Sequence, residues 1–231
     1  MPNIIMADKK PGDYEASDWL DLTKPVGVVT SSVQFNNNSS GYNFFGRTGI
    51  TELHLPETLY VPRYICYRCL NLEDITAPNA TTISENAFEQ CKLSVVVFPK
   101  VVQVKSYAFK SILSLKSADF GGTPGLNAGF DGSQTFCGSS NFDTLVLRGL
   151  AVWRLSLTLT FDGTKFAYGK SGGTLYVPAS LISSYQAATN WATILGYENN
   201  HIKSIESTAT DPDAPVDLTT HYIDGTPIPN A

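Results

Sequence analysis

Apolar positions along the chain follow a repeat of about 21 or 22 residues. Three short segments with alternating apolar residues each end in a proline, at Pro56, Pro78 and Pro99. Strict alternation of this kind predicts half-buried β-strands. A regular interval between such strands predicts a repeat architecture in which each unit contributes one strand.

The same register continues beyond each proline. The fifth residue after each proline is β-branched and apolar: Val61, Ile83 and Val104. Ten residues on stands a cysteine or a phenylalanine: Cys66, Phe88 and Phe109. Thirteen residues on stands a second small or apolar residue: Cys69, Cys91 and Ile112. Because several positions coincide over three consecutive units, we interpret them as equivalent core positions of stacked coils.

This pattern resembles the BspA-type leucine-rich repeat, in which a short strand ends near proline and an Ala-Phe-x-x-Cys segment follows, as at 87–91. The resemblance is clear over residues 44–120, and weaker copies continue to about residue 205. It implies a mainly β repeat solenoid, right-handed, with short parallel strands. A helix at about 179–195 is expected to cap its C-terminal end, because Leu181, Tyr185, Ala188 and Trp191 recur at helical spacing.

The chain then divides into three parts. Residues 1–24 are polar and predict an N-terminal arm, either a cap or a flexible docking segment. Residues 25–206 form the solenoid with its cap. Residues 207–231 are rich in proline, aspartate and threonine, which predicts an extended tail without its own core.

Cys66 and Cys69 form a Cys-x-x-Cys pair, which invites a zinc or redox interpretation. Both residues instead occupy core positions of one repeat, and Ile112 fills the same position as Cys69 in a later unit. We therefore predict buried structural thiols. A zinc site and a Cys69–Cys91 disulfide stay as alternatives.

Composition narrows the classes of function. The chain has 231 residues and a formal charge of −5, with only 16% charged residues. Scattered lysines and arginines argue against nucleic-acid binding, and no apolar run is long enough for a membrane helix. The first residues lack the apolar core of a secretory signal, so Sec export is not expected.

Chemistry-bearing residues do not gather in the repeat map. The three histidines, His54, His201 and His221, lie in an early coil, the cap and the tail. Gly-rich segments at 121–125 and 169–173 do not match a phosphate-binding loop. We therefore expect no catalytic residues, no metal site and no cofactor, and His54 is expected to project from the sheet into solvent.

The outward positions of the strands are the remaining candidates for binding. They flank the inward apolar residues and form a mixed row: Glu52, His54, Asp74, Thr76, Val95, Val97, Ser117, Asp119, Thr144 and Val146. This row is either an ordinary sheet face or a shallow binding groove.

The hypothesis favoured by these features is a non-enzymatic structural or adhesion component of a phage particle or phage-tail-like assembly. Such a protein would be assembled in the host cytoplasm and located in the virion. Its terminal arms would contact other subunits, and the outward face of its strands would contact a host-surface protein or glycan. The protein would not insert into a membrane. The alternatives are a bacterial BspA-like surface adhesin and a cytoplasmic protein-interaction scaffold. The preference for phage is by analogy with the family.

Overall fold

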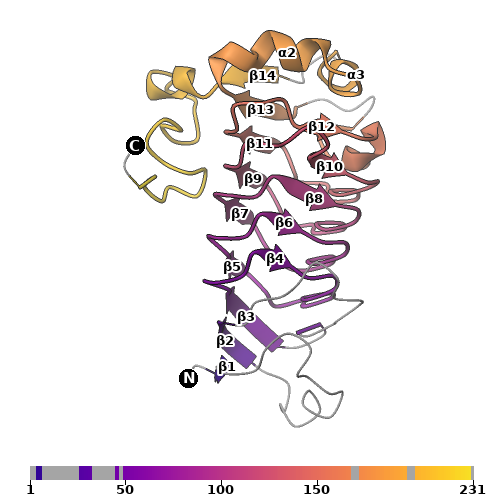
Figure 1. Ribbon diagram of the computed structural model, residues 1–231, viewed down its shortest axis with the longest axis vertical. Coiled ribbons are helices and arrows are strands. Elements are labelled where there is room, and N and C mark those ends of the chain that lie inside the picture. Colours follow the sequence, from indigo (N-terminus) through magenta and orange to yellow (C-terminus); the bar gives the residue numbers. More distant parts are fainter. Residues whose placement is uncertain are drawn as a thin grey trace.

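The computed structural model describes residues 4–6, 26–32, 45–46, 49–167, 172–196 and 201–229. In this part of the chain, successive coils stack into an elongated body with short strands along two sides (Figure 1). The repeat solenoid expected from the sequence is confirmed.

One side of the stack carries two consecutive parallel sheets. The first has four strands in the order β1 (Ile4–Met6), β2 (Val26–Ser31), β3 (Gly49–His54) and β5 (Asp74–Thr76). The second has five strands in the order β7 (Val95–Phe98), β9 (Ser117–Phe120), β11 (Thr144–Leu147), β13 (Thr174–Val177) and β14 (His201–Ser204). β5 lies beside β7, so the two sheets follow one another along the stack (Figure 1). We call the outward side of these strands the front face.

The other side carries a third parallel sheet of very short strands. Its order is β4 (Tyr60–Val61), β6 (Thr82–Ile83), β8 (Gln103–Lys105), β10 (Gly129–Asp131) and β12 (Arg154–Leu155). The five coils from β3 to β12 therefore contribute one strand to each side, whereas β1, β2, β13 and β14 extend only the first side in the described residues. The apolar core lies between the two sides.

The turns that close the coils repeat an unusual backbone conformation. Asn86 and Gln90 have φ angles of 57° and 61°, and Tyr107 and Ser111, one coil later, have 62° and 57°. Left-handed non-glycine residues cost conformational energy. Hydrogen bonds between coils offset that cost here, since Phe88 N donates to the carbonyl oxygen of Ala108 at 2.9 Å.

The core contains a ladder of stacked phenylalanines. Phe88, Phe109, Phe136 and Phe161 are fully buried, and each ring centroid lies 5.5 Å from the next. Phe88 and Phe109 are the residues ten positions after successive prolines, so the repeat register read from the sequence is confirmed. Phe161 comes from a 3-10 turn, η1 (Thr158–Phe161), rather than from a regular repeat.

The C-terminal cap differs from the single helix expected at 179–195. It consists of a 3-10 turn, η2 (Ala179–Leu181), followed by α2 (Ile182–Ala187) and α3 (Trp191–Leu195). The helix is interrupted because Ala188 is extended and Asn190 is left-handed, with a φ of 66°. The Asn190 side-chain amide donates to the carbonyl oxygens of Leu155 and Ser156, which ties the interruption to the last coils.

At the other end, β1 pairs in parallel with β2 and so extends the first sheet. Three residues of the expected N-terminal arm therefore belong to the stack. The rest of the arm lies outside the described residues.

Candidate functional site

The strand register places the outward residues named from the sequence in two rows on the front face. Thr76 pairs with His54 across β3 and β5, while Asp119 pairs with both Val97 and Val146 across β7, β9 and β11. Tyr176 on β13 and Lys203 on β14 continue the row that contains Asp119 and Val146.

The C-terminal segment, residues 205–229, folds back over part of this face. It begins with a 3-10 turn, η3 (Glu206–Ala209), and runs beside the strands near the capped end of the stack (Figure 1). Its apolar residues join strand residues in a second, smaller core: Val146, Tyr176, Ile205, Leu218 and Ile223, with Val95, Val97 and Val216 packed against it. The tail has no core apart from the one that it shares with the strands, but it does not extend away from the coils, because its apolar residues are buried against the front face.

A buried ion pair fastens this segment to the coils. Arg148 donates to both carboxylate oxygens of Asp119, at 2.8 and 2.7 Å, and to the carbonyl oxygens of Leu218 at 2.6 Å and His221 at 2.8 Å. Asp119 also accepts a hydrogen bond from the Ile223 amide at 3.0 Å. Burial raises the pKa of the Asp119 carboxyl, while Arg148 and the amide act in the opposite direction.

The burial of the predicted face residues follows from this arrangement. Asp119 and Val146 have no exposed surface, because the ion pair and the C-terminal segment cover them. Ser117 is also buried and Thr144 is half-buried, so the expectation that these four are exposed does not hold in full. The residues toward the N-terminal end stay accessible: Glu52, His54, Asp74 and Thr76, with Val95 and Val97 half-buried.

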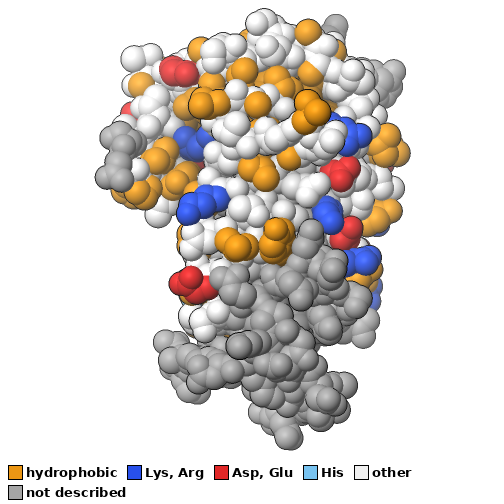
Figure 2. Space-filling view, viewed as in Figure 1, with side chains coloured by type: hydrophobic (Ala, Val, Ile, Leu, Met, Phe, Trp, Pro, Cys, Tyr) orange, Lys and Arg blue, Asp and Glu red, His pale blue; other side chains and the backbone are white. Residues whose placement is uncertain are grey.

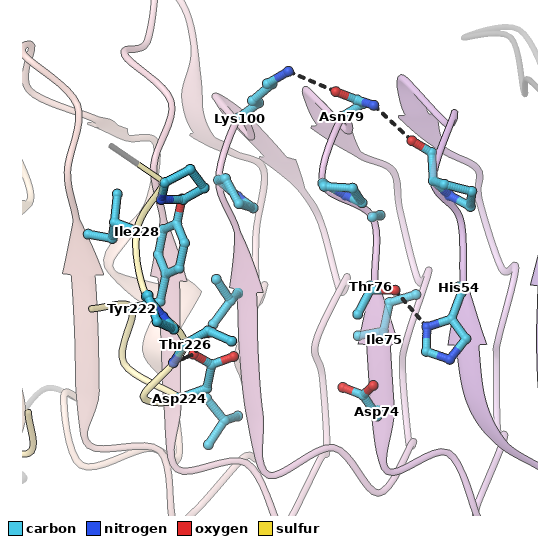
Figure 3. Close-up of a pocket in the computed structure, with 18 of the residues that line it drawn as sticks. His54, Asp74, Ile75, Thr76, Asn79, Lys100, Tyr222, Asp224, Thr226 and Ile228 are labelled. Carbon is cyan, nitrogen blue, oxygen red and sulfur yellow. Dashed lines mark hydrogen bonds between the residues drawn. The ribbon is translucent and has the colours of Figure 1, made fainter. Parts of the chain in front are cut away.

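A groove of about 1110 Å³ lies between the last residues of the C-terminal segment and the strands of the front face. Figure 3 shows His54, Asp74 and Thr76 on the strand side and Tyr222, Asp224 and Ile228 on the other.

The repeat prolines, Pro56, Pro78 and Pro99, lie along the same groove. Asn79, beside Pro78, donates to the carbonyl oxygen of Pro56 at 2.8 Å and accepts from Lys100 at 2.7 Å (Figure 3). These bonds link three successive coils at the margin of the groove.

A cluster of polar side chains lies at the N-terminal side of the groove. His54 Nδ1 is 2.7 Å from the Thr76 hydroxyl, and His54 Nε2 is 3.4 Å from a carboxylate oxygen of Glu52. One donor atom each from Glu52, His54 and Asp74 lies within 4.8 Å of the others. His54 therefore makes specific contacts on the sheet instead of projecting alone into solvent.

The cysteines act as small apolar core residues whose thiols can also donate a hydrogen bond. None of the four forms a disulfide; Cys66, Cys69 and Cys91 are buried, and Cys137 is half-buried. Cys91 Sγ donates to the carbonyl oxygen of Cys66 at 3.1 Å. Burial raises the pKa of the Cys66 and Cys91 thiols. The structural interpretation of the thiols is supported, and the Cys69–Cys91 disulfide is absent.

Comparison with known proteins matches the BspA type leucine rich repeat region, in six copies, over residues 29–116 and 60–148. The chain belongs to the BspA-type leucine-rich repeat family. The BspA-type coils thus provide the strands that floor the groove, whereas the C-terminal segment that forms its other side lies outside the matched residues.

A crystal structure of a leucine-rich repeat protein from Bacteroides ovatus ATCC 8483 is also similar, with 14% sequence identity and a TM-score of 0.36. The match covers 75% of this chain and 59% of that one. No curated protein matches the chain.

Charged side chains of both signs are mixed on the surface. On the side seen in Figure 2, lysines and arginines are interspersed with aspartates and glutamates, and no large patch of one sign is visible among the coloured residues. None of the helices in the described part of the chain is long and apolar enough to cross a membrane.

Sequence reasoning missed one side of the groove. Tyr222, Asp224 and Ile228 belong to a polar, proline-bearing stretch with no periodicity, and they reach the groove only because Leu218 and Ile223 are buried nearby. The adjacency of Glu52 and Asp74 could have been found, since the two residues stand one repeat length, 22 positions, apart.

Proposed function

We propose that this BspA-type leucine-rich repeat protein is a non-enzymatic binding module, and that the groove on its front face receives a protein or glycan from a host surface. The observation that carries the proposal is the groove itself, which is built from the four coils that contain β2, β3, β5 and β7 and from the C-terminal segment. Concave sites lined by apolar groups with a few placed polar groups are the usual form of binding sites.

The dimensions and chemistry of the groove suit an extended ligand. Its volume of about 1110 Å³ lies at the upper end of the roughly 300–1000 Å³ typical of small-molecule pockets, and the groove is open along one side. Val95, Val97 and Ile228 supply apolar contact, whereas His54, Asp74 and Lys100 supply charge and hydrogen bonds. This mixture favours a peptide strand or an oligosaccharide over a compact metabolite.

The proposal is tested by titrating fluorescently labelled full-length protein onto intact bacterial cells from the source culture. Saturable binding that excess unlabelled protein displaces would support a surface-binding role. Binding that stays linear with concentration, or that unlabelled protein does not displace, would contradict it.

The setting that we propose for this binding is a phage particle or phage-tail-like assembly. The four cysteines form no disulfide in the structure, which is in keeping with assembly in a reducing cytoplasm. In this proposal residues 1–24 contact the neighbouring subunits, because the C-terminal segment is packed against the front face. Mass spectrometry of purified particles tests the setting: a fixed ratio to a capsid or tail subunit supports it, and absence of the chain contradicts it in favour of a surface adhesin or a cytoplasmic scaffold.

A further inference from the structure

Three potential metal ligands come together from two neighbouring coils on the front face. Glu52 and His54 stand two residues apart on β3, and therefore on the same side of the strand. The register with β5 places Asp74 opposite Glu52 and Thr76 opposite His54. The donor atoms of Glu52, His54 and Asp74 consequently lie within 4.8 Å of one another.

The histidine is oriented in the way that metal-binding histidines are. Its Nδ1 is 2.7 Å from the Thr76 hydroxyl, so a proton on Nδ1 can be donated there and the Nε2 lone pair is left for a cation. Nε2 is 3.4 Å from a Glu52 carboxylate oxygen. Two ligands bound tetrahedrally to zinc at about 2.0–2.2 Å stand about 3.3–3.6 Å apart, a range that includes this distance.

In the described residues, His54 is the only basic side chain that lies at ion-pair distance from a carboxylate of the cluster. Glu52 and Asp74 are directly opposite one another, and like charges in such cross-strand positions are destabilising. Among the residues that the structure describes, no lysine or arginine forms an ion pair with either. The two other carboxylates on strands, Asp119 and Asp131, are paired with Arg148 and Arg154.

From these observations we propose that Glu52, His54 and Asp74 bind a divalent first-row transition-metal ion, of which Zn²⁺ fits best. One imidazole nitrogen with two carboxylate oxygens is a donor set suited to zinc, whereas calcium takes six to eight oxygens. All three side chains are accessible, so the exposed carboxylate of Asp74 can close on the ion by a change of rotamer.

The site also adjoins the groove, since His54 and Asp74 line it (Figure 3). The coordination positions that the protein leaves open can therefore accept a carboxylate or hydroxyl oxygen from a bound ligand. This last step rests on the proposed function of the groove, but binding of the ion does not.

The test is calorimetric titration of the metal-stripped, full-length protein with Zn²⁺, repeated with Co²⁺ to record the absorption of a bound cobalt ion. We expect one ion per chain. His54→Ala and Asp74→Asn should each weaken binding at least tenfold, and Thr76→Val, which removes only the orienting hydroxyl, about tenfold. His201→Ala is the matched control, because His201 is also exposed on a front-face strand, and it should bind as the wild type does.

Absence of Zn²⁺ binding, wild-type affinity in His54→Ala or Asp74→Asn, or loss of binding in His201→Ala would each overturn the proposal. Thermal unfolding of every variant verifies that the fold is retained, which is expected because the altered side chains are accessible. A failed zinc titration would leave the binding role of the groove standing, since saturable binding of metal-free protein to cells tests that role separately.

Discussion

Arg148 and Asp119 join two neighbouring coils and the C-terminal segment through one buried ion pair. The carboxylate has no exposed surface and the arginine side chain is 12% exposed. The same guanidinium binds two carbonyl oxygens of residues 70 and 73 positions later in the chain, and it lies 5.2 Å from the ring centroid of Tyr222. One side chain thus determines where the segment lies and hence one side of the groove.

Replacing Arg148 by methionine should destabilise the protein by about 3–5 kcal/mol, because Asp119 would stay buried without its partner. Lys165→Met is the control, since the Lys165–Asp143 ion pair, at 2.8 Å, is partly exposed and should contribute at most about 1 kcal/mol. Denaturant unfolding measures both free energies. Equal effects of the two substitutions would show that the buried pair does not anchor the segment.

The phenylalanine ladder should be the most sensitive part of the core. Phe136 is fully buried and its ring stacks on Phe109, Phe142 and Phe161. Phe136→Ala should therefore cost about 3–5 kcal/mol through lost burial and the cavity left behind. Leu126→Ala, at a side chain that is 98% exposed, should change the free energy of unfolding by less than about 0.5 kcal/mol. An unchanged melting temperature for Phe136→Ala would contradict the stacking of the coils.

The cysteines should differ in their reaction with a neutral maleimide. Cys137 is half-buried and should be labelled first, whereas Cys66 and Cys91 should react only when the protein unfolds. Peptide mapping by mass spectrometry after timed labelling distinguishes the sites. Rapid labelling of Cys66 or Cys91 in the native protein would contradict their place in the core.

Burial of the thiols also predicts a dependence of stability on pH. Because the pKa values of Cys66 and Cys91 are raised on folding, their contribution is fully present below the pKa of an unfolded thiol, about 8.5, and is lost as the pH rises above it. The free energy of unfolding should therefore fall as the pH rises above about 8.5. The double variant Cys66→Ala, Cys91→Ala should show a shallower fall over this range; an unchanged slope would argue against buried thiols as its source.

The coils could be predicted from the sequence because their signals are local and periodic. Pro56, Pro78 and Pro99 mark equivalent strand ends, and Phe88 and Phe109 occupy equivalent positions of the ladder. The interruption of the cap was not predictable from the spacing of Tyr185 and Trp191, since it depends on how the Asn190 side chain meets the last coils.

The path of the C-terminal segment could not be predicted for a related reason. Val216, Leu218 and Ile223 are separated by polar residues and follow no repeat period, so the local pattern does not indicate a core. The burial of Leu218 and Ile223 depends on contacts with Val146 and Tyr176, more than 40 residues away in the chain, and on the carbonyl oxygens that Arg148 binds. Only the folded arrangement brings these groups together.

The measurement that tests the binding role of the groove most directly compares two threonine-to-arginine variants in the cell-binding titration. Thr76→Arg places a long charged side chain in the groove from an accessible position, while Thr193→Arg places the same side chain on the exposed surface of α3, outside the residues that line the groove. Both variants should fold as the wild type does. We predict that Thr76→Arg loses saturable binding and Thr193→Arg keeps it; wild-type binding by Thr76→Arg would contradict the account.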